Sequence, residues 1–213
     1  MTNKMIGIVG GVGSYAGIDL IKKVYDLTEA TSDQEHLPVS MLSVPHKIKD
    51  RTKYLLGETQ TNPGIAIAEI IASLIASGST IIGIPCNTAH AKPILSLIEK
   101  SIPESCVLVN LIEEVGLHIS TKHPEITKVG VLGTTGTILA KVYPEVLSKY
   151  NIEVIQPSED IQDLFVHPSI YDTSYGIKAF SNPVNEKAKE NLSMAATYLS
   201  RKGAQAVILG CTE

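Results

Sequence analysis

Two cysteines stand at matching positions in the sequence, each just after an apolar run that is typical of a buried strand. Cys86 lies in GIPCNTAHA and Cys211 lies in VILGCTE. Polar residues follow each cysteine at once, and a helical pattern begins by Ala91. Free N–H groups at the start of a helix favour a thiolate over a thiol. We therefore take Cys86 and Cys211 as candidate reactive residues. Cys106, which leads into a strand and has no counterpart, is expected to be a packing residue.

Paired thiols are suited to three kinds of chemistry. A metal site needs three or four ligands, and the His and Asp positions show no ligand spacing, so we expect no metal ion. A redox pair would join the two sulfurs in a disulfide, and the sequence leaves this alternative open. Proton transfer at a stereocentre is the third kind. One thiolate removes a proton from one face of a carbon, and the other thiol delivers a proton to the opposite face.

Two loops that follow expected strands are candidates for binding. The loop GGVGS (10–14) resembles a variant of the dinucleotide fingerprint, but the second strand ends at SVPHK without the carboxylate that NAD recognition needs. We therefore expect no cofactor, and we expect Gly11 to form a tight turn where the backbone approaches a ligand. The loop GTTGT (133–137) offers hydroxyl and N–H groups to an anion such as a carboxylate. Helix capping by Thr135 or Thr137 is the alternative.

The elements that must position these residues alternate along the chain. Strands are expected at Met5–Val9, Val39–Val44, Thr80–Ile84, Val107–Asn110, Lys128–Leu132, Glu153–Gln156 and Gln205–Leu209. Helical spacing appears at Ala16–Glu29, Pro63–Ser77, Ala91–Lys100, Leu139–Tyr150 and Asn185–Lys202. This alternation is typical of α/β proteins with mainly parallel sheets, and the continuously apolar strands indicate burial on both faces.

Two pairs of segments match between the halves of the chain. MIGIVGGVGS (5–14) aligns with KVGVLGTTGT (128–137), and GSTIIGIPCNT (78–88) aligns with GAQAVILGCTE (203–213), at nearly the same offset. Each match is a strand that runs into a loop. Two matches in the same order indicate two similar halves.

We therefore expect an α/β fold of two similar Rossmann-like domains with mainly parallel sheets, related by a pseudo-two-fold axis. The first domain, 1–113, carries Cys86, and the second, 114–213, carries Cys211. Ligands bind at the C-terminal edge of open parallel sheets. We accordingly expect the active site in the cleft between the domains, with one thiol on each wall.

Composition narrows the class of protein. Of 213 residues, 44% are hydrophobic and 19% are charged, as in ordinary globular proteins. The net charge of -4 at pH 7 argues against a nucleic-acid partner. No apolar run is long enough to span a membrane. Three widely spaced cysteines provide no disulfide framework, so we expect the protein in the reducing cytoplasm.

Several motifs together resemble the aspartate/glutamate racemase family, in particular the aspartate racemases that work without pyridoxal phosphate. They span nearly the whole chain and are GIVGGVG, DQEHLP, DRTKYLLG, PCNTAHA, TTGT, YGIK and GCTE. The resemblance implies two α/β domains, a homodimer, and cofactor-independent interconversion of L- and D-aspartate. It also implies that the cysteines of PCNT and GCTE, Cys86 and Cys211, are the two bases.

The resemblance changes how two cations are interpreted. Taken alone, Arg51 and Lys178 are typical of solvated surface charges, and His90 is typical of a residue that fixes a turn. In the family, the arginine of DRT and the lysine of GIK hold the side-chain carboxylate of aspartate, which implies this role for Arg51 and Lys178. The positions that match those expected to hold the α-carboxylate or amine are Asn87, Thr88, Thr134, Thr135 and Thr212.

The resemblance also sets the alternatives. Relatives continue beyond GCTE with a strand and a helix that return to the first domain, and this sequence ends at Glu213, so we expect that extension to be absent. Glutamate stays open as a second substrate. Maleate isomerase, hydantoin racemase and arylmalonate decarboxylase use related cysteine sites, although two cations favour a dicarboxylic amino acid. A binding protein without turnover and a Cys86–Cys211 redox switch are the remaining alternatives.

Overall fold

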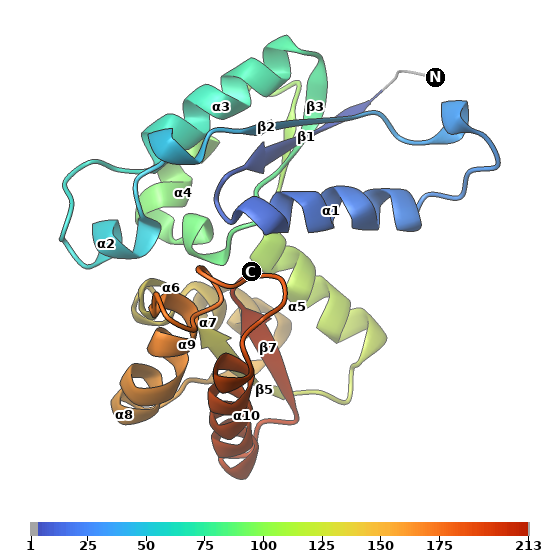
Figure 1. Ribbon diagram of the computed structural model, residues 1–213. Coiled ribbons are helices and arrows are strands. Elements are labelled where there is room, and N and C mark those ends of the chain that lie inside the picture. The colour runs from blue at the N-terminus through green and yellow to red at the C-terminus, as the bar shows by residue number, and fades with distance from the viewer. Residues whose placement is uncertain (1–3, 213) are drawn as a thin grey trace. The chain divides into compact units, whose positions relative to one another are not determined.

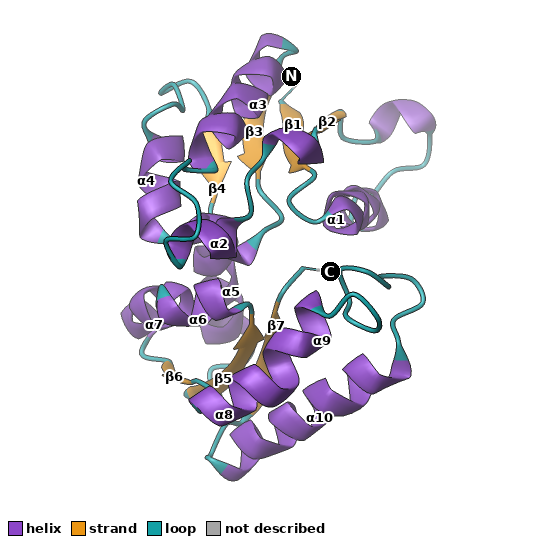
Figure 2. Ribbon diagram, turned by 60° about the vertical axis from the view of Figure 1, so that its left-hand side comes forward, coloured by secondary structure: helices purple, strands orange, loops and turns teal. Residues whose placement is uncertain are grey.

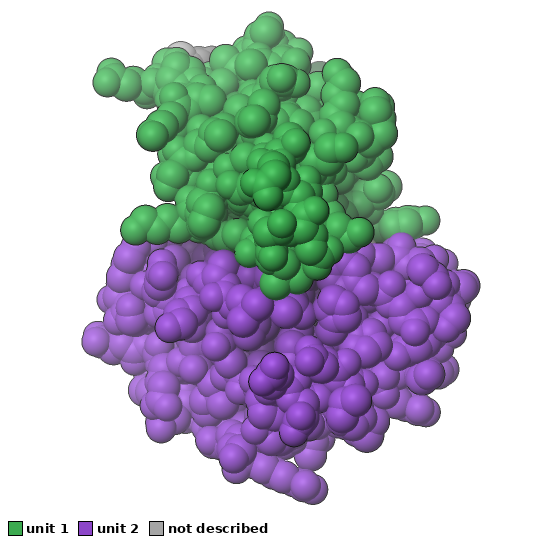
Figure 3. Space-filling view, turned by 90° about the vertical axis from the view of Figure 1, so that its left-hand side faces the viewer, with its two compact units in different colours: residues 1–111 green, residues 112–213 purple. Residues whose placement is uncertain are grey.

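The computed structural model describes residues 4–212, and the chain divides into two compact units, residues 1–111 and 112–213 (Figure 3). Glu213, the last residue of the GCTE motif, lies outside the described residues. The boundary expected after residue 113 falls inside helix α5 (Leu111–Lys122), and the two units divide at the first residues of that helix.

The first unit is built on a four-stranded parallel sheet with strand order β2-β1-β3-β4 (Figure 1). Its strands are β1 (Met5–Gly10), β2 (Val39–Ser43), β3 (Ser79–Gly83) and β4 (Val107–Val109). Helix α1 (Ser14–Asp26) covers one face of the sheet, whereas α3 (Gly64–Ala76) and α4 (Lys92–Glu99) lie on the other (Figure 2). The connections contain η1 (Asp33–Glu35), η2 (Pro45–Lys47), α2 (Arg51–Leu55) and η3 (Asn87–His90).

The second unit has a three-stranded parallel sheet with strand order β6-β5-β7. Its strands are β5 (Lys128–Gly133), β6 (Glu153–Ile155) and β7 (Ala206–Gly210). Helix α10 (Glu186–Arg201) packs on β5 and β7. The shorter helical elements are α6 (Thr135–Leu139), α7 (Val142–Leu147), η4 (Ser148–Tyr150), α8 (Glu159–Ile161), η5 (Gln162–Val166) and α9 (His167–Tyr171).

The predicted α/β fold with parallel sheets is confirmed, and each expected strand is present. The helix expected at Leu139–Tyr150 is present from Val142 onward, as α7 followed by η4. Its expected start is wrong, because Lys141, at a φ of 50°, separates it from the preceding helix α6. That left-handed backbone cannot continue a right-handed helix, so the helix must restart at Val142.

The expectation that the strands are buried on both faces is wrong for two of the edge strands. The inner strands β1 and β5 are largely buried. The edge strands β4 and β7 expose Val107 by 59% and Leu209 by 72%. An apolar run shows which side chains are hydrophobic, but it does not show which face a neighbouring element covers.

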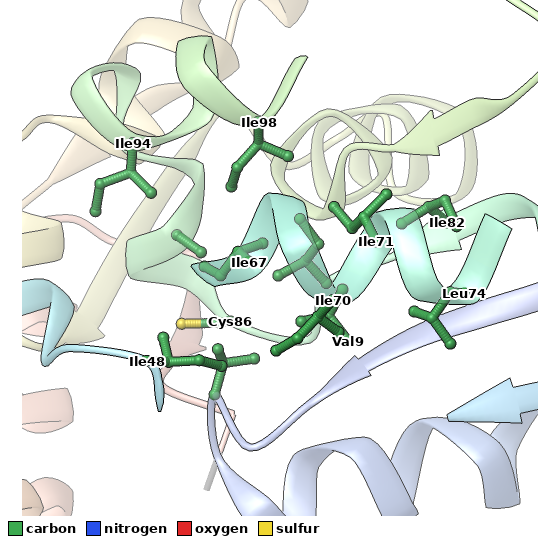
Figure 4. Close-up of a cluster of buried hydrophobic side chains, with 13 residues drawn as sticks. Val9, Ile48, Ile67, Ile70, Ile71, Leu74, Ile82, Cys86, Ile94 and Ile98 are labelled. Carbon is green, nitrogen blue, oxygen red and sulfur yellow. The ribbon is translucent and has the colours of Figure 1, made fainter. Parts of the chain in front are cut away.

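The core of the first unit lies between α3 and the sheet. Ile67, Ile71 and Ile82 are fully buried there, and Cys86 belongs to the same cluster, beside Ile48 (Figure 4). Burial of each such isoleucine contributes roughly 1.5–3 kcal/mol. The segment that carries Cys86 therefore packs against the hydrophobic core of the first unit.

Helix α5 packs closely on η4 because Gly116 has no side chain. A Cβ at this position would lie 2.5 Å from Cδ2 of Tyr150 and 3.1 Å from Cδ2 of Leu147. We expect Gly116→Ala to lower the free energy of unfolding by about 1–3 kcal/mol, because overpacking outweighs the helix-propensity gain of about 1 kcal/mol. Urea denaturation followed by circular dichroism measures this loss.

The matched control is Gly17→Ala in α1. A Cβ at Gly17 would press only on the flexible sulfur of Met41, at 2.8 Å. Met41 can shift at little cost, so this variant should lose clearly less stability than Gly116→Ala. Equal losses in the two variants would contradict the packing explanation.

Candidate active site

Parallel pairing brings the loops of the first unit to one edge of its sheet. Gly10 pairs with Ser43, and Ile8 pairs with Gly83, so β1, β2 and β3 end at the same edge. The segments that leave this edge carry Gly11, Arg51 and Cys86. Ligands of open parallel sheets bind at this edge, where strand carboxyl ends meet.

The thiol of Cys86 lies at the start of a turn and not directly at a long helix. Its backbone is extended, with φ −152° and ψ 111°, and the residue is 5% exposed. A 3-10 turn, η3, follows, and α4 begins only at Lys92. Asn87 and Thr88, the predicted binding residues, are buried in this turn.

His90 closes the turn that follows Cys86. Its Nδ1 lies 2.8 Å from the carbonyl oxygen of Cys86, and its Nε2 accepts a hydrogen bond of 3.2 Å from the N–H of Leu111. A carbonyl only accepts and an amide N–H only donates, so these partners fix the neutral tautomer with the proton on Nδ1. Burial lowers the pKa of His90 to about 4, although the bond to Cys86 opposes that shift. The predicted role in fixing the turn is confirmed.

Arg51 is the first residue of α2, which packs against η3. Asp50 caps this helix by accepting a hydrogen bond from the N–H of Lys53 at 2.9 Å. Nη1 of Arg51 lies 3.5 Å from the carbonyl oxygen of Lys49. The packing of α2 on η3 therefore places the helix that carries the cation next to the turn that carries the thiol.

Gly11 is explained by contacts within the protein. Its φ is 77°, and a Cβ there would lie 2.9 Å from the nitrogen of Pro45. Only glycine adopts this conformation without strain and allows so close an approach. The β1–α1 loop thus lies against the segment after β2, and the binding role predicted for Gly11 stays a prediction.

The second unit repeats this arrangement around two glycines. Gly133 pairs with Gly210 at the ends of β5 and β7. A Cβ on Gly133 would lie 3.0 Å from the carbonyl oxygen of Gly210, so both positions need glycine for the strands to end side by side. Because the strands are parallel, Thr134 and Cys211 leave the same edge next to each other.

The threonine loop caps helix α6 through Thr134. Its Oγ1 accepts a hydrogen bond from the N–H of Thr137 at 3.2 Å and lies 3.0 Å from the Thr137 hydroxyl oxygen. Capping by Thr135 or Thr137, the alternative drawn from the sequence, is wrong, because the cap is one residue earlier. The Thr135 side chain is therefore not used in the cap.

Tyr143 lies close to Cys211. A Cβ on Gly210, the residue before Cys211, would lie 3.4 Å from Cε2 of Tyr143. Burial, and then the charge of Cys211, raise the pKa of the Tyr143 phenol above its usual range. Tyr143 is therefore a neutral hydroxyl beside the second thiol at physiological pH, and no motif in the sequence marks it as a site residue.

Thr135 contacts two residues that sequence reasoning missed. Its Oγ1 lies 2.9 Å from Nδ1 of His167 and 3.3 Å from Nε2 of Gln162. The His167 ring stacks on Tyr171 with centroids 4.8 Å apart, and Nζ of Lys178 lies 5.5 Å from the Tyr171 ring centroid. The structure thus connects two predicted site residues, Thr135 and Lys178, through a histidine and a tyrosine.

The predicted site residues divide between the two units. Gly11, Arg51, Cys86, Asn87 and Thr88 belong to the first unit, and Thr134, Thr135, Lys178, Cys211 and Thr212 belong to the second. Among residues 4–212, no three His, Cys, Asp or Glu side chains form a group that could hold a metal ion. Within the same range, no helix combines the length and the apolar content that a membrane crossing requires.

Comparison with known proteins identifies relatives along the whole chain. A profile described as Asp/Glu/hydantoin racemase matches residues 9–213. An aspartate racemase from Picrophilus torridus is 27% identical with a TM-score of 0.77, over 98% of this chain and 81% of that chain. A glutamate racemase from Francisella tularensis subsp. tularensis SCHU S4, in complex with D-glutamate, shares the fold. Its identity is 20% and its TM-score 0.63, over 100% of this chain and 70% of that chain.

A curated relative matches over a shorter segment. It is an uncharacterized protein in the pnlA 3' region of Pectobacterium carotovorum subsp. carotovorum, 35% identical over 92 residues. The match covers 43% of this chain and 56% of that protein. The chain therefore spans little more than half the length of this relative.

Low pH should lower the free energy of unfolding, because the buried His90 resists protonation in the folded state. In the folded state its pKa is about 4, against 6.5 for an exposed imidazole, so this residue contributes its full stability above pH 6.5. That contribution is lost as the pH falls from 6.5 to about 4, because the unfolded chain takes up the proton first. We expect the stability difference between wild type and His90→Asn to shrink by on the order of 3 kcal/mol over this range.

Denaturant unfolding at a series of pH values measures this linkage. The matched control is His46→Asn, because it makes the same substitution at an exposed histidine and leaves the buried turn intact. If wild type and His90→Asn keep a constant difference down to pH 4, the buried neutral imidazole does not stabilise the fold in this way.

Proposed function

The chain belongs to the Asp/Glu/hydantoin racemase family, and we propose that it interconverts L- and D-aspartate without a cofactor, using Cys86 and Cys211 as two bases. One observation carries this proposal. Each unit has a cysteine within three residues of the C-terminal end of a parallel strand, followed in the sequence by polar residues that can bind a carboxylate. Two thiols that each follow a parallel strand suit a reaction whose two directions are mirror images.

The proposed reaction moves one proton off the α-carbon and another onto it. A thiolate sulfur takes the α-proton and becomes a thiol, and the electron pair of the C–H bond moves into the carboxylate. The second thiol then gives its proton to the opposite face of the carbon and becomes a thiolate. After one turnover the two cysteines have exchanged protonation states, so the enzyme is ready for the other enantiomer.

The α-hydrogen of an amino acid is a very weak acid, so the negative charge that develops on the carboxylate must be stabilised. Asn87 and Thr88 in one unit, and Thr134 and Thr135 in the other, offer amide and hydroxyl donors. A donor aimed at developing charge is typically worth roughly 3 kcal/mol. The cap made by Thr134 and the buried turn at Asn87 support fixed donors that need no reorganisation.

Two cations favour a substrate with a second carboxylate. Arg51 and Lys178 match the DRT and GIK motifs of the aspartate racemases that the sequence resembles. The Picrophilus torridus aspartate racemase, at 27% identity, supports aspartate as the substrate. Glutamate is the alternative.

The proposed setting is the cytoplasm. Cys86, Cys106 and Cys211 are all thiols that form no disulfide within residues 4–212. Both bases must stay unoxidised to exchange protons, and a reducing compartment provides that condition. The homodimer implied by the family resemblance stays a prediction.

Removing either base should abolish racemisation. We expect Cys86→Ala and Cys211→Ala each to lower the rate by about 10²- to 10⁴-fold, because each deletes one acid–base group. Chiral chromatography of D-aspartate formed from L-aspartate measures the rate. Cys106→Ala is the control, because its buried sulfur contacts the Ser79 carbonyl at 3.7 Å and has no assigned chemistry. An undiminished rate in Cys86→Ala would overturn the two-base mechanism, and aspartate binding without turnover by wild type would indicate a binding protein.

Neutralising either cation should weaken recognition of aspartate. We expect Arg51→Gln and Lys178→Gln each to lower kcat/KM by about 10-fold or more, the cost of losing one charge-assisted hydrogen bond. Lys187→Gln is the matched control, since Lys187 also lies over a tyrosine ring, 4.0 Å from the Tyr175 centroid. If all three variants lose the same activity, the effect comes from general charge and not from substrate contacts.

A further inference from the structure

We propose that His167 and Gln162 are positioning residues that direct the hydroxyl proton of Thr135 toward the substrate carboxylate. This inference rests on the proposed function and names residues beyond the motifs that led to it. The contacts lie entirely within the second unit. The inference uses three features: the π-helix η5, the hydrogen-bonding capacity of the Gln162 amide, and the tautomer of the His167 imidazole.

The π-helix brings Gln162 and His167 to one face. The N–H of His167 donates to the carbonyl oxygen of Gln162, five residues earlier. In an α-helix, residues five apart point about 140° away from each other, because each residue turns the chain by about 100°. The wider π-turn places them one above the other, so both side chains reach Oγ1 of Thr135. Single π-turns inside helices are frequently found at functional sites.

The amide of Gln162 has a fixed orientation. Its Nε2 lies 3.0 Å from the carbonyl oxygen of Gly133, which can only accept a hydrogen bond. The amino group must therefore face Gly133, and the same group donates to Thr135 Oγ1 at 3.3 Å. Gln162 is 4% exposed, so its own amide group is shielded from water. One lone pair of the Thr135 hydroxyl is thus occupied by a donor.

The tautomer of His167 then decides what Thr135 can offer. If Nδ1 carries a proton and donates to Oγ1 at 2.9 Å, both lone pairs of the hydroxyl are used and its own proton is available to a ligand. If Nδ1 accepts instead, the hydroxyl proton points at the imidazole. A carboxylate can only accept, so its binding requires the first arrangement. We infer that the bound substrate selects the Nδ1–H form of His167.

The aromatic stack holds the imidazole in the required orientation. The planes of His167 and Tyr171 are inclined by 24°, with centroids 4.8 Å apart. Lys178 lies over the same tyrosine, at 5.5 Å from its centroid. Lys178 is proposed to bind the side-chain carboxylate, and Thr135 is proposed to bind the α-carboxylate. The two residues are therefore connected by contacts through Tyr171 and His167.

Two substitutions at His167 separate hydrogen bonding from packing. His167→Phe keeps the ring stack on Tyr171 but loses Nδ1, whereas His167→Asn keeps an N–H donor near the Nδ1 position and loses the stack. Calorimetry would give the dissociation constant of succinate, and racemisation kinetics would give KM and kcat for aspartate. We expect His167→Phe to weaken succinate binding and raise KM by about 10-fold, with a smaller change in kcat, and His167→Asn to restore most of the affinity.

A double-mutant cycle tests whether His167 acts through Thr135. On a Thr135→Val background, His167→Phe should cause little further loss, because the hydroxyl that it positions is gone. Full additivity of the two losses would overturn the inference, as would a His167→Phe variant that binds succinate like wild type. If His167→Asn binds succinate more weakly than His167→Phe, only the packing of the ring matters, and the inference is again overturned.

Succinate has no α-amino group and is not racemised, so it separates this inference from the proposed function. If wild type binds succinate in the expected His167-dependent manner but never racemises aspartate, the proposed function fails and the positioning role stands. If wild type racemises aspartate and the His167 variants match it in every constant, the positioning role fails alone. If wild type does not bind succinate, the positioning role is overturned.

Discussion

Parallel pairing of strands is the constraint on which the rest of the structure depends. In each unit it forces loops from distant parts of the sequence to leave a sheet at one edge. In the second unit the contact between Gly133 and Gly210 makes this most explicit, because a Cβ on either residue would meet the backbone of the other strand within 3.1 Å. The threonine loop and the second cysteine emerge side by side because the strands can approach so closely.

Two imidazoles fix the loops that carry the proposed chemistry, and they do so in different ways. His90 is buried between a carbonyl and an amide N–H, so its tautomer is dictated by the backbone and it cannot gain a proton without losing a partner. His167 faces the hydroxyl of Thr135, which can either donate or accept, so its tautomer is free to follow the ligand. Rigid placement of donors lowers the cost of stabilising charge when the reaction occurs. The first unit therefore supplies a fixed turn, and the second supplies a hydroxyl that adapts its proton to an anion.

The sequence predicted the strands well because they leave local traces, and it marked Cys86 and Cys211 as candidates by their place after two of them. Apolar β-branched runs marked each strand, and the repeated strand-to-loop pattern paired Cys86 with Cys211. The sequence could not predict the break between α6 and α7, because it depends on the left-handed backbone of Lys141, a residue type that usually continues helices. The sequence could not predict the exposure of Leu209 either, because that exposure depends on β7 being an edge strand. Gln162 and His167 escaped notice because only a π-turn places side chains five residues apart on one face, and no short motif encodes that turn.

The measurement that tests the two-base proposal most directly is the isotopic content of product and substrate early in the reaction. Wild-type protein would be incubated with L-aspartate in deuterated water, and both enantiomers would be separated and examined by mass spectrometry before one tenth has turned over. Two thiols on opposite faces predict D-aspartate that carries deuterium at the α-carbon while the remaining L-aspartate keeps its protium, because the second thiol is equilibrated with solvent. D-aspartate that retains the original protium, or L-aspartate labelled as fast as product forms, would require a single base and would contradict the account.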